Sequence, residues 1–419
     1  MKNSIKENIE NPEKLEQIYQ SDKKSFEKEF AEIYSEISNS QLIEFWKIRL
    51  GFDKKRVETA TFQKEDVLYL LLSSVLAFFL IKIPQIFGID FSTYLFYEKN
   101  SGLIVLFSLS VYLFLTKKTL EFNKIALSLG VFIVSAIYIN LLPNDINSNS
   151  INLAFIHLPL MLWCLYGIIF IDFNLTDRHK RIDYIKYNGD LAVLGAVMAI
   201  AGVILAGVTI GLFAAIDIKI ERFYMEYFGV WGLVSLPIVA TFIIKNYSIV
   251  TNKIANIIAN IFSPLVLITL VVYLISIVVT GKDPYNDREF LIIFNLMLLG
   301  VMAIIVFSVS EISNNKKQRF NEIVLFILSI VTLIIDFVAI SAIFYRLGEY
   351  GFTPNRVAVL GSNLLIFGNL LLIMIDLFKV NFRNMDLSKV EIQIGKYLPI
   401  YVVWTVFVVF VLPFVFGLK

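Results

Sequence analysis

The stretch Val67–Ile83, VLYLLLSSVLAFFLIKI, is almost entirely apolar and nearly as long as a bilayer is thick. Crossing the ~30 Å hydrocarbon core takes about 20 mostly apolar residues at a rise of about 1.5 Å each. A second such run, Tyr401–Phe416, is YVVWTVFVVFVLPFVF. Because only helices and closed barrels satisfy their backbone polar groups in lipid, these runs predict an all-α, polytopic α-helical membrane protein.

The composition of the whole chain supports this prediction. Of the 419 residues, 57% are hydrophobic and 17% are charged, whereas soluble domains have roughly 45–50% and about 25%. The net charge of +2 gives no basic footprint for nucleic acid. With one cysteine and two histidines, the chain offers neither an internal disulfide nor a cysteine or multi-histidine metal site. We therefore expect no metal and no cofactor.

Two parts differ sharply in hydropathy. Residues 1–65 are polar and predict a small helical segment, whereas residues 66–419 predict a transmembrane domain. About eleven spans fit the apolar runs, with boundaries uncertain by a few residues. They lie at 66–84, 102–116, 125–142, 152–172, 191–214, 228–244, 260–280, 290–309, 323–343, 357–377 and 398–418.

The N-terminal segment has the pattern of three short amphipathic helices. Asn11-Pro12 is typical of a helix start, with a capping side chain followed by proline at the first helical position. Helices this short are marginal alone. We therefore expect residues 10–50 to dock on the membrane domain or on a cytoplasmic protein partner.

Lysine and arginine gather in alternate loops, such as residues 178–186 and 379–396, on the same side as the basic connector Lys54-Lys55-Arg56 that precedes the first predicted span. The positive-inside rule then predicts a cytoplasmic N-terminus and an external C-terminus. The N-terminus lacks the apolar core of a cleaved signal. The expected location is the bacterial inner membrane, as a multi-pass protein in contact with lipid; the sequence does not set the oligomeric state.

Four polar residues fall at one predicted depth in the external half of four spans. They are Asp336, His157, Asn295 and Asn363, with Asp336 about seven residues, or ~10 Å, from the external end of its span. Buried ionisable groups are costly in hydrocarbon and mark functional sites. The functional interpretation is an outward-opening polar cavity that binds a cation or proton; the alternative is a hydrogen-bonded cluster that fixes helix packing.

The fifth predicted span is rich in small residues at a spacing of four. This seam contains Gly195, Gly202, Gly207 and Gly211. Small residues let two helix backbones approach closely. We expect the seam to pack against another helix of this chain, with a second copy as the alternative.

The predicted external loop YRLGEYGFTPNRVAVLG contains a helix start in which Thr353 caps and Pro354 follows. Arg356 then lies in the first turn, where the helix dipole disfavours a cation unless an acid is near; Glu349 and Glu289 are candidate acids. Arg346 and Arg356 would bind an anionic headgroup or substrate carboxylate, or serve as interfacial arginines with structural partners.

The YGFTPNR stretch, with Arg346 ahead of it, resembles the signature of a bacterial multi-pass family, the domain of unknown function family 4153. The N-terminal pattern LEQIYQSDKKSFEKEF followed by FWKIRL resembles the cytoplasmic segment of its Bacteroidetes-type members. The resemblance covers most of the chain. It implies a multi-pass membrane protein and attaches no activity, substrate or cofactor to it.

Enzyme signatures are absent from the sequence, including the HExxH pair, the GxSxG elbow and the Walker loop. We therefore expect a protein that is not an enzyme. The first hypothesis is a transporter or binding protein for a small solute or ion, acting through the polar cavity. The alternative is a membrane scaffold or sensor whose N-terminal helices contact a partner.

Overall fold

The computed structural model describes most of the chain and divides it into two compact units, residues 1–63 and 64–419. The sequence placed this boundary two residues later. The described residues are 4–5, 8, 11–22, 25–26, 29–30, 42, 45–46, 49–50, 64–88, 90, 94–117, 121–214, 219–246, 263–268, 270–272, 274–275, 279, 285, 288–312 and 319–419.

The N-terminal unit is organised around helix α2 (Pro12–Ser21). As predicted, the Asn11 side chain caps this helix by accepting a hydrogen bond from the backbone N–H of Lys14. The core consists of one apolar side chain from α2 and four from other parts of the unit. These are Leu15, Ile5, Phe26, Phe30 and Trp46. The unit therefore has a small hydrophobic core of its own.

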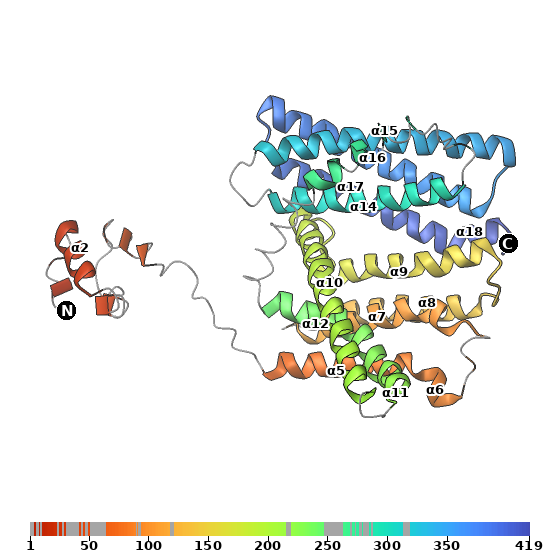
Figure 1. The fold of residues 1–419 in the computed structure, drawn as a ribbon, viewed down its shortest axis with the longest axis horizontal. Coiled ribbons are helices and arrows are strands. Elements are labelled where there is room, and N and C mark those ends of the chain that lie inside the picture. Colours follow the sequence, from red (N-terminus) through yellow and green to blue (C-terminus); the bar gives the residue numbers. More distant parts are fainter. Residues whose placement is uncertain are drawn as a thin grey trace. The chain divides into compact units, whose positions relative to one another are not determined.

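Every regular element described in the second unit is helical (Figure 1). In chain order they are α5 (Lys64–Ile81), α6 (Ile83–Phe87), α7 (Phe96–Leu115), α8 (Phe122–Leu141), α9 (Asn149–Phe170), α10 (Arg178–Ala214), α11 (Glu221–Tyr224), the π-helix η1 (Met225–Gly229), α12 (Val230–Asn246), α14 (Arg288–Ile312), α15 (Arg319–Tyr350), α16 (Pro354–Arg383), α17 (Ser388–Val406), the π-helix η2 (Phe407–Val411) and α18 (Leu412–Val415).

Eight helical stretches within the described residues are long and apolar enough to cross a membrane. They match eight of the predicted spans. The predicted spans at 66–84 and 290–309 correspond to α5 and α14. The predicted span at 260–280 is described only in part, and its described residues are helical. The predicted span at 102–116 was too short, because α7 begins at Phe96 and has 20 residues.

The helices pack in two groups, and α10 joins them. One group centres on α5, α7, α8, α9 and α12, and the other on α14 to α17. Ile182 and Ile185 of α10 belong to the core of the second group, whereas Tyr187 belongs to a core of the first. Figure 1 shows α10 running across the direction that α7, α8, α9 and α15 share. Hydropathy alone did not predict this crossing course.

Close helix contacts form where a glycine faces a bulky side chain. A Cβ atom on Gly102 of α7 would lie 2.5 Å from Cγ of Pro159 in α9. A Cβ atom on Gly361 of α16 would lie 1.9 Å from the indole of Trp404 in α17. Both glycines are therefore required by the packing, since any larger residue would overlap its neighbour.

The predicted small-residue seam of α10 is not one of these contacts. Among the described residues, nothing lies within 4 Å of a Cβ atom built on Gly202 or Gly207, and Gly195 meets only Leu236, at 3.2 Å. The surroundings of the Gly211 side-chain position lie outside the described residues. No described helix therefore packs on the seam at Gly202 and Gly207.

The last of these long apolar helical stretches carries a break that the sequence explains. Pro413 has no N–H to donate to the carbonyl of Val409, four residues earlier. The hydroxyl of Tyr138, from α8, donates to that carbonyl at 2.7 Å, and the break coincides with η2. A side chain from another helix thus replaces the bond that proline removes, and it ties α8 to the end of the chain.

Candidate functional site

Asp336 lies at the centre of the second helix group. It is in the middle of the 32 residues of α15, and its exposed fraction is 0%. Neither carboxyl oxygen has a hydrogen-bond partner among the described residues. A buried polar group without a partner is costly and calls for an explanation.

Asn369 matches Asp336 in depth. It lies in the middle of the 30 residues of α16, the helix that packs most extensively against α15, and its exposed fraction is 1%. The predicted span at 323–343 is shorter than α15, which continues to Tyr350. Asp336 and Asn369 occupy equivalent positions near the midpoints of their helices.

Tyr401 of α17 is the hydrogen-bond partner of Asn369. Its hydroxyl accepts a hydrogen bond from Nδ2 of Asn369 at 3.0 Å. The Oδ1 atom of Asn369 has no partner among the described residues. Asp336 and Asn369 are buried near the midpoints of their helices, and Tyr401 is partly buried; we refer to these three residues as the Asp336 cluster.

The other members of the predicted polar layer lie elsewhere. Nδ2 of Asn363 donates to Oδ1 of Asn295 at 2.7 Å, which joins α16 to α14. His157 bonds through Nδ1 to the carbonyl of Leu153 on its own helix, at 2.9 Å. Among the described contacts none joins Asp336 to these three residues. The structure therefore forms one predicted pair and gives Asp336 different neighbours.

Sequence reasoning missed the roles of Asn369 and Tyr401. Asn369 was recognisable as a polar residue in the middle of a span, but the depth assigned to Asp336 did not match it. Tyr401 gave no comparable signal, because a tyrosine near the start of a predicted span is ordinary at a membrane interface. Only the packing of α17 against α16 brings its hydroxyl to Asn369.

Arg356 has structural partners. Thr353 caps α16 as predicted, and the Arg356 guanidinium donates to the carbonyls of Tyr350 and Gly351, at 2.9 and 2.7 Å. These carbonyls lie at the C-terminal end of α15, where the helix dipole favours a cation. This explains a cation in the first turn of α16 without the predicted help of Glu349, which is exposed.

Arg346 lies one turn before the end of α15, and its hydrogen bonding differs from that of Arg356. Its Nη1 atom is buried and has no hydrogen-bond partner among the described residues. The structure therefore does not bring Arg346, Glu349 and Arg356 together into one anion site.

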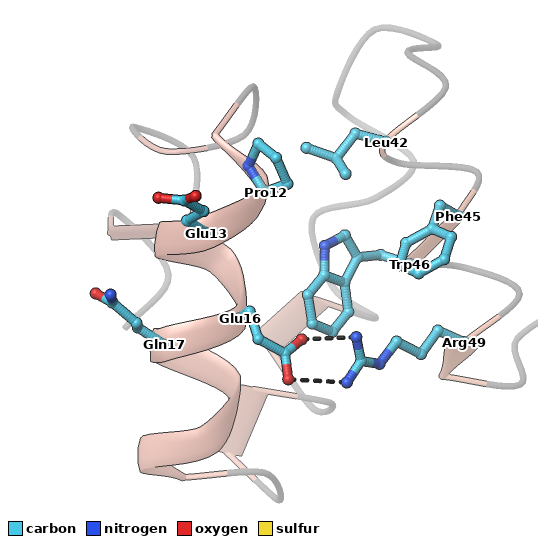
Figure 2. A pocket seen from close by; sticks show the side chains of 8 residues that line it. All are labelled: Pro12, Glu13, Glu16, Gln17, Leu42, Phe45, Trp46 and Arg49. Atoms are coloured by element: carbon cyan, nitrogen blue, oxygen red, sulfur yellow. Dashed lines mark hydrogen bonds and ion pairs between the residues drawn. The ribbon is translucent and has the colours of Figure 1, made fainter.

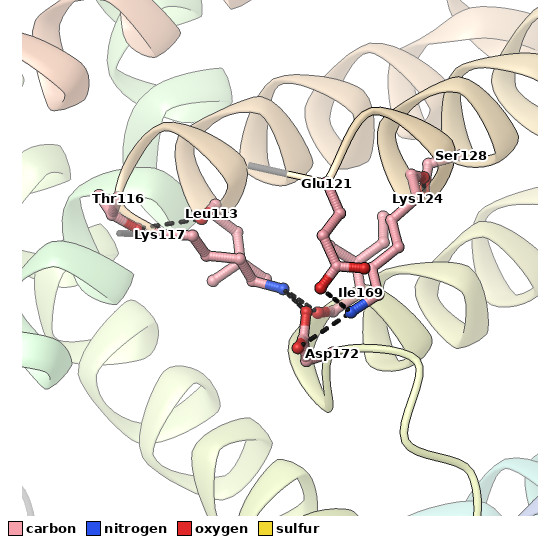
Figure 3. Close-up of polar contacts among 8 residues, drawn as sticks. All are labelled: Leu113, Thr116, Lys117, Glu121, Lys124, Ser128, Ile169 and Asp172. Atoms are coloured by element: carbon pink, nitrogen blue, oxygen red, sulfur yellow. Dashed lines mark hydrogen bonds and ion pairs between the residues drawn. The ribbon is translucent and has the colours of Figure 1, made fainter. Parts of the chain in front are cut away.

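A second polar cluster lies where α9 ends (Figure 3). Nζ of Lys117 donates to Oδ1 of Asp172 at 2.8 Å and to the carbonyl of Ile169 at 2.9 Å. Nζ of Lys124 reaches Oδ2 of Asp172 at 3.1 Å and Oε1 of Glu121 at 2.8 Å. The cluster ties the connection between α7 and α8 to the end of α9.

The pKa of Asp172 is lowered, first by the hydrogen bond from Lys117 and then by the bond from Lys124. A lowered pKa means that the ionised form stabilises the fold at pH values above 3.8, the ordinary value. The contribution is lost as the pH falls through the lowered pKa of the folded state.

We expect Asp172→Asn to lower the thermal midpoint at neutral pH and to have no effect once the pH is well below 3.8. The side chain is 47% exposed, so the cost is about 0.2–1 kcal/mol, as for other exposed ion pairs. Thermal unfolding in detergent across this pH range measures it. A difference that persists unchanged at the acid end would contradict the assignment.

The N-terminal unit contains a shallow pocket of about 460 Å³ between α2 and the segment around Trp46 (Figure 2). At its edge Glu16 forms an ion pair with Arg49 at 2.6 Å. Phe45, which lines the pocket, is 53% exposed. The indole Nε1 of Trp46 is buried and has no acceptor among the described residues. The pocket thus combines an exposed ring with an unused donor.

No family model, curated protein or solved structure matches this chain. The resemblance to family 4153 stays a prediction. Within the described residues, no group of three or more His, Cys, Asp or Glu side chains could hold a metal ion.

Proposed function

We propose that the membrane unit binds or transports a small solute or ion, and that the Asp336 cluster is its binding group. The observation that carries the proposal is the fully buried Asp336 carboxyl, whose two oxygens have no partner among the described residues. An acid retained in this state lowers stability, as functional groups in membrane helices do. The rest of the proposal is a bacterial inner-membrane protein with a cytoplasmic N-terminus and an outward-opening path to Asp336.

The structural alternative is supported less well. A cluster that only fixes helix packing would have its hydrogen bonds made, as those between Asn363 and Asn295 are. Asp336 makes none among the described residues. Ligand binding accounts for unused acceptors, whereas packing does not.

Charge movement across a membrane tests the proposal. The purified protein is reconstituted into phosphatidylethanolamine–phosphatidylglycerol vesicles on a solid-supported electrode, and the bath is stepped in H⁺, Na⁺ or K⁺ concentration. We expect a transient current with the wild type for at least one cation, and the current of protein-free vesicles with Asp336→Asn. The neutral amide removes the charge that would bind the cation and nearly preserves shape.

Asp376→Asn is the matched control, since Asp376 is another acid of this helix group and is paired with Lys379 at 2.8 Å. It should keep the wild-type current. The proposal fails if the wild type gives no current in any of the three steps, or if Asp336→Asn gives the same current as the wild type.

A second candidate function is a membrane scaffold or sensor, and the pocket of the N-terminal unit favours it. The exposed Phe45 ring lines the pocket beside the ion pair between Glu16 and Arg49. Together they offer a partner peptide an aromatic surface and charged groups.

A photo-crosslinking residue at position 45 tests this candidate in cells. We expect one discrete adduct with a protein partner from position 45 and none from position 20, because Gln20 lies on α2 but does not line the pocket. Equal labelling at both positions, or none at position 45, would contradict a partner in the pocket.

A further inference from the structure

The Asp336 cluster has more hydrogen-bond acceptors than donors. Three oxygens have no donor among the described residues: both carboxyl oxygens of Asp336 and Oδ1 of Asn369. The Asn369 amide already donates to the Tyr401 hydroxyl. The remaining donor is the Tyr401 hydroxyl hydrogen, which can satisfy one oxygen. At least two acceptors stay unused, so the cluster would accept a positively charged species and not an anion.

The charged groups on the neighbouring helices do not neutralise Asp336. On α16, Asp376 and Lys379 pair with each other. On α17, Lys396 is exposed, and on α9, His157 bonds to Leu153. An unpaired carboxylate at this depth is strongly disfavoured, because neither hydrocarbon nor the described side chains replace its water.

Binding of a proton would address both the negative charge of the Asp336 carboxylate and the shortage of hydrogen-bond donors around it. It removes the negative charge, and it converts one carboxyl oxygen from an acceptor into an O–H donor. A cation such as Ca²⁺ would need about six to eight oxygen ligands, and the cluster offers three unpartnered ones.

We infer that Asp336 is a proton-binding site inside the membrane. Binding transfers a proton from H₃O⁺ to the carboxylate, which gives a carboxylic acid and one water molecule. Release is the reverse reaction. The inference rests on the proposed function in that it names the proton as the species that the site handles.

Infrared spectroscopy of the protein in lipid at neutral pH tests the inference without any gradient or transport assay. A protonated carboxyl group has a C=O stretching band that a carboxylate lacks. We expect Asp336→Asn to remove one carboxyl group from this band, and Asp376→Asn to remove none, because the Asp376 carboxylate forms an ion pair with Lys379 at 2.8 Å.

The inference is overturned if Asp336→Asn leaves the band unchanged, because Asp336 is then ionised. It is also overturned if Na⁺ or K⁺ raises the thermal midpoint of the wild type but not of Asp336→Asn, which would assign a metal cation to the site. Either result leaves the proposed function standing with another ion. Conversely, if Asp336→Asn removes a carboxyl group from the band but the wild type gives no current in the vesicle experiment, the proton site is supported and transport is rejected.

Discussion

Gly361→Ala is expected to lower the free energy of unfolding by about 3 kcal/mol, near the upper end of the usual cost of overpacking. The added Cβ atom would lie 1.9 Å from the Trp404 ring. That ring is held on its other sides, since its Nε1 donates to Ser362 and it stacks on Phe407 at 5.3 Å. Neither α16 nor the indole can yield without breaking these contacts.

Gly202→Ala is the matched control, because it adds the same methyl group to a helix position with nothing within 4 Å. It should melt at or above the wild-type temperature, as alanine favours a helix over glycine. Thermal unfolding in detergent compares the two variants. If both melt like the wild type, the contact between α16 and α17 is looser than the structure has it.

These two glycines show what the sequence could not reveal about packing. A stripe of small residues predicts where a helix can be approached, and it drew attention to Gly202 and Gly207. Whether a neighbour occupies that face depends on the course of α10, which crosses the other helices (Figure 1). The close approaches at Gly102 and Gly361 belong to single glycines whose partners, Pro159 and Trp404, are distant in sequence.

The helical architecture itself was predictable, because hydrophobic runs of membrane length have few other solutions. The positions of the helix ends were less predictable. Hydropathy detects where a segment leaves the apolar layer, but a helix continues into water as long as its backbone bonds are made. α10 begins at Arg178 and α15 ends at Tyr350, both well beyond the predicted spans at 191–214 and 323–343.

The same effect decided how much of the candidate site could be predicted. Asp336 stood out because it is the one acid well inside a predicted span. Its neighbours were then chosen by depth, counted from the predicted span end, and that end lay seven residues before Tyr350, where α15 ends. The pair between Asn363 and Asn295 was found, whereas Asn369 and Tyr401 were not.

Asp336→Leu is expected to raise the thermal midpoint of the protein while abolishing its activity. Neither carboxyl oxygen has a partner among the described residues, and a buried polar group without a bond costs about 1–3 kcal/mol. Leucine has nearly the same shape and no polar atom, so replacing the carboxyl group removes that cost. Even a protonated carboxyl group that donates to Asn369 leaves its other oxygen buried.

Asn369→Leu is the variant with which Asp336→Leu is compared. Asn369 is as buried as Asp336, but its amide makes a hydrogen bond to Tyr401 at 3.0 Å, so its loss should lower the midpoint. Scanning fluorimetry of both variants in detergent measures the two shifts. Shifts of opposite sign in the two thermal midpoints would show that Asp336 lowers the stability of the protein, as a ligand-binding group often does. A fall in both midpoints would mean that Asp336 makes a stabilising contact and would favour a packing role for the cluster.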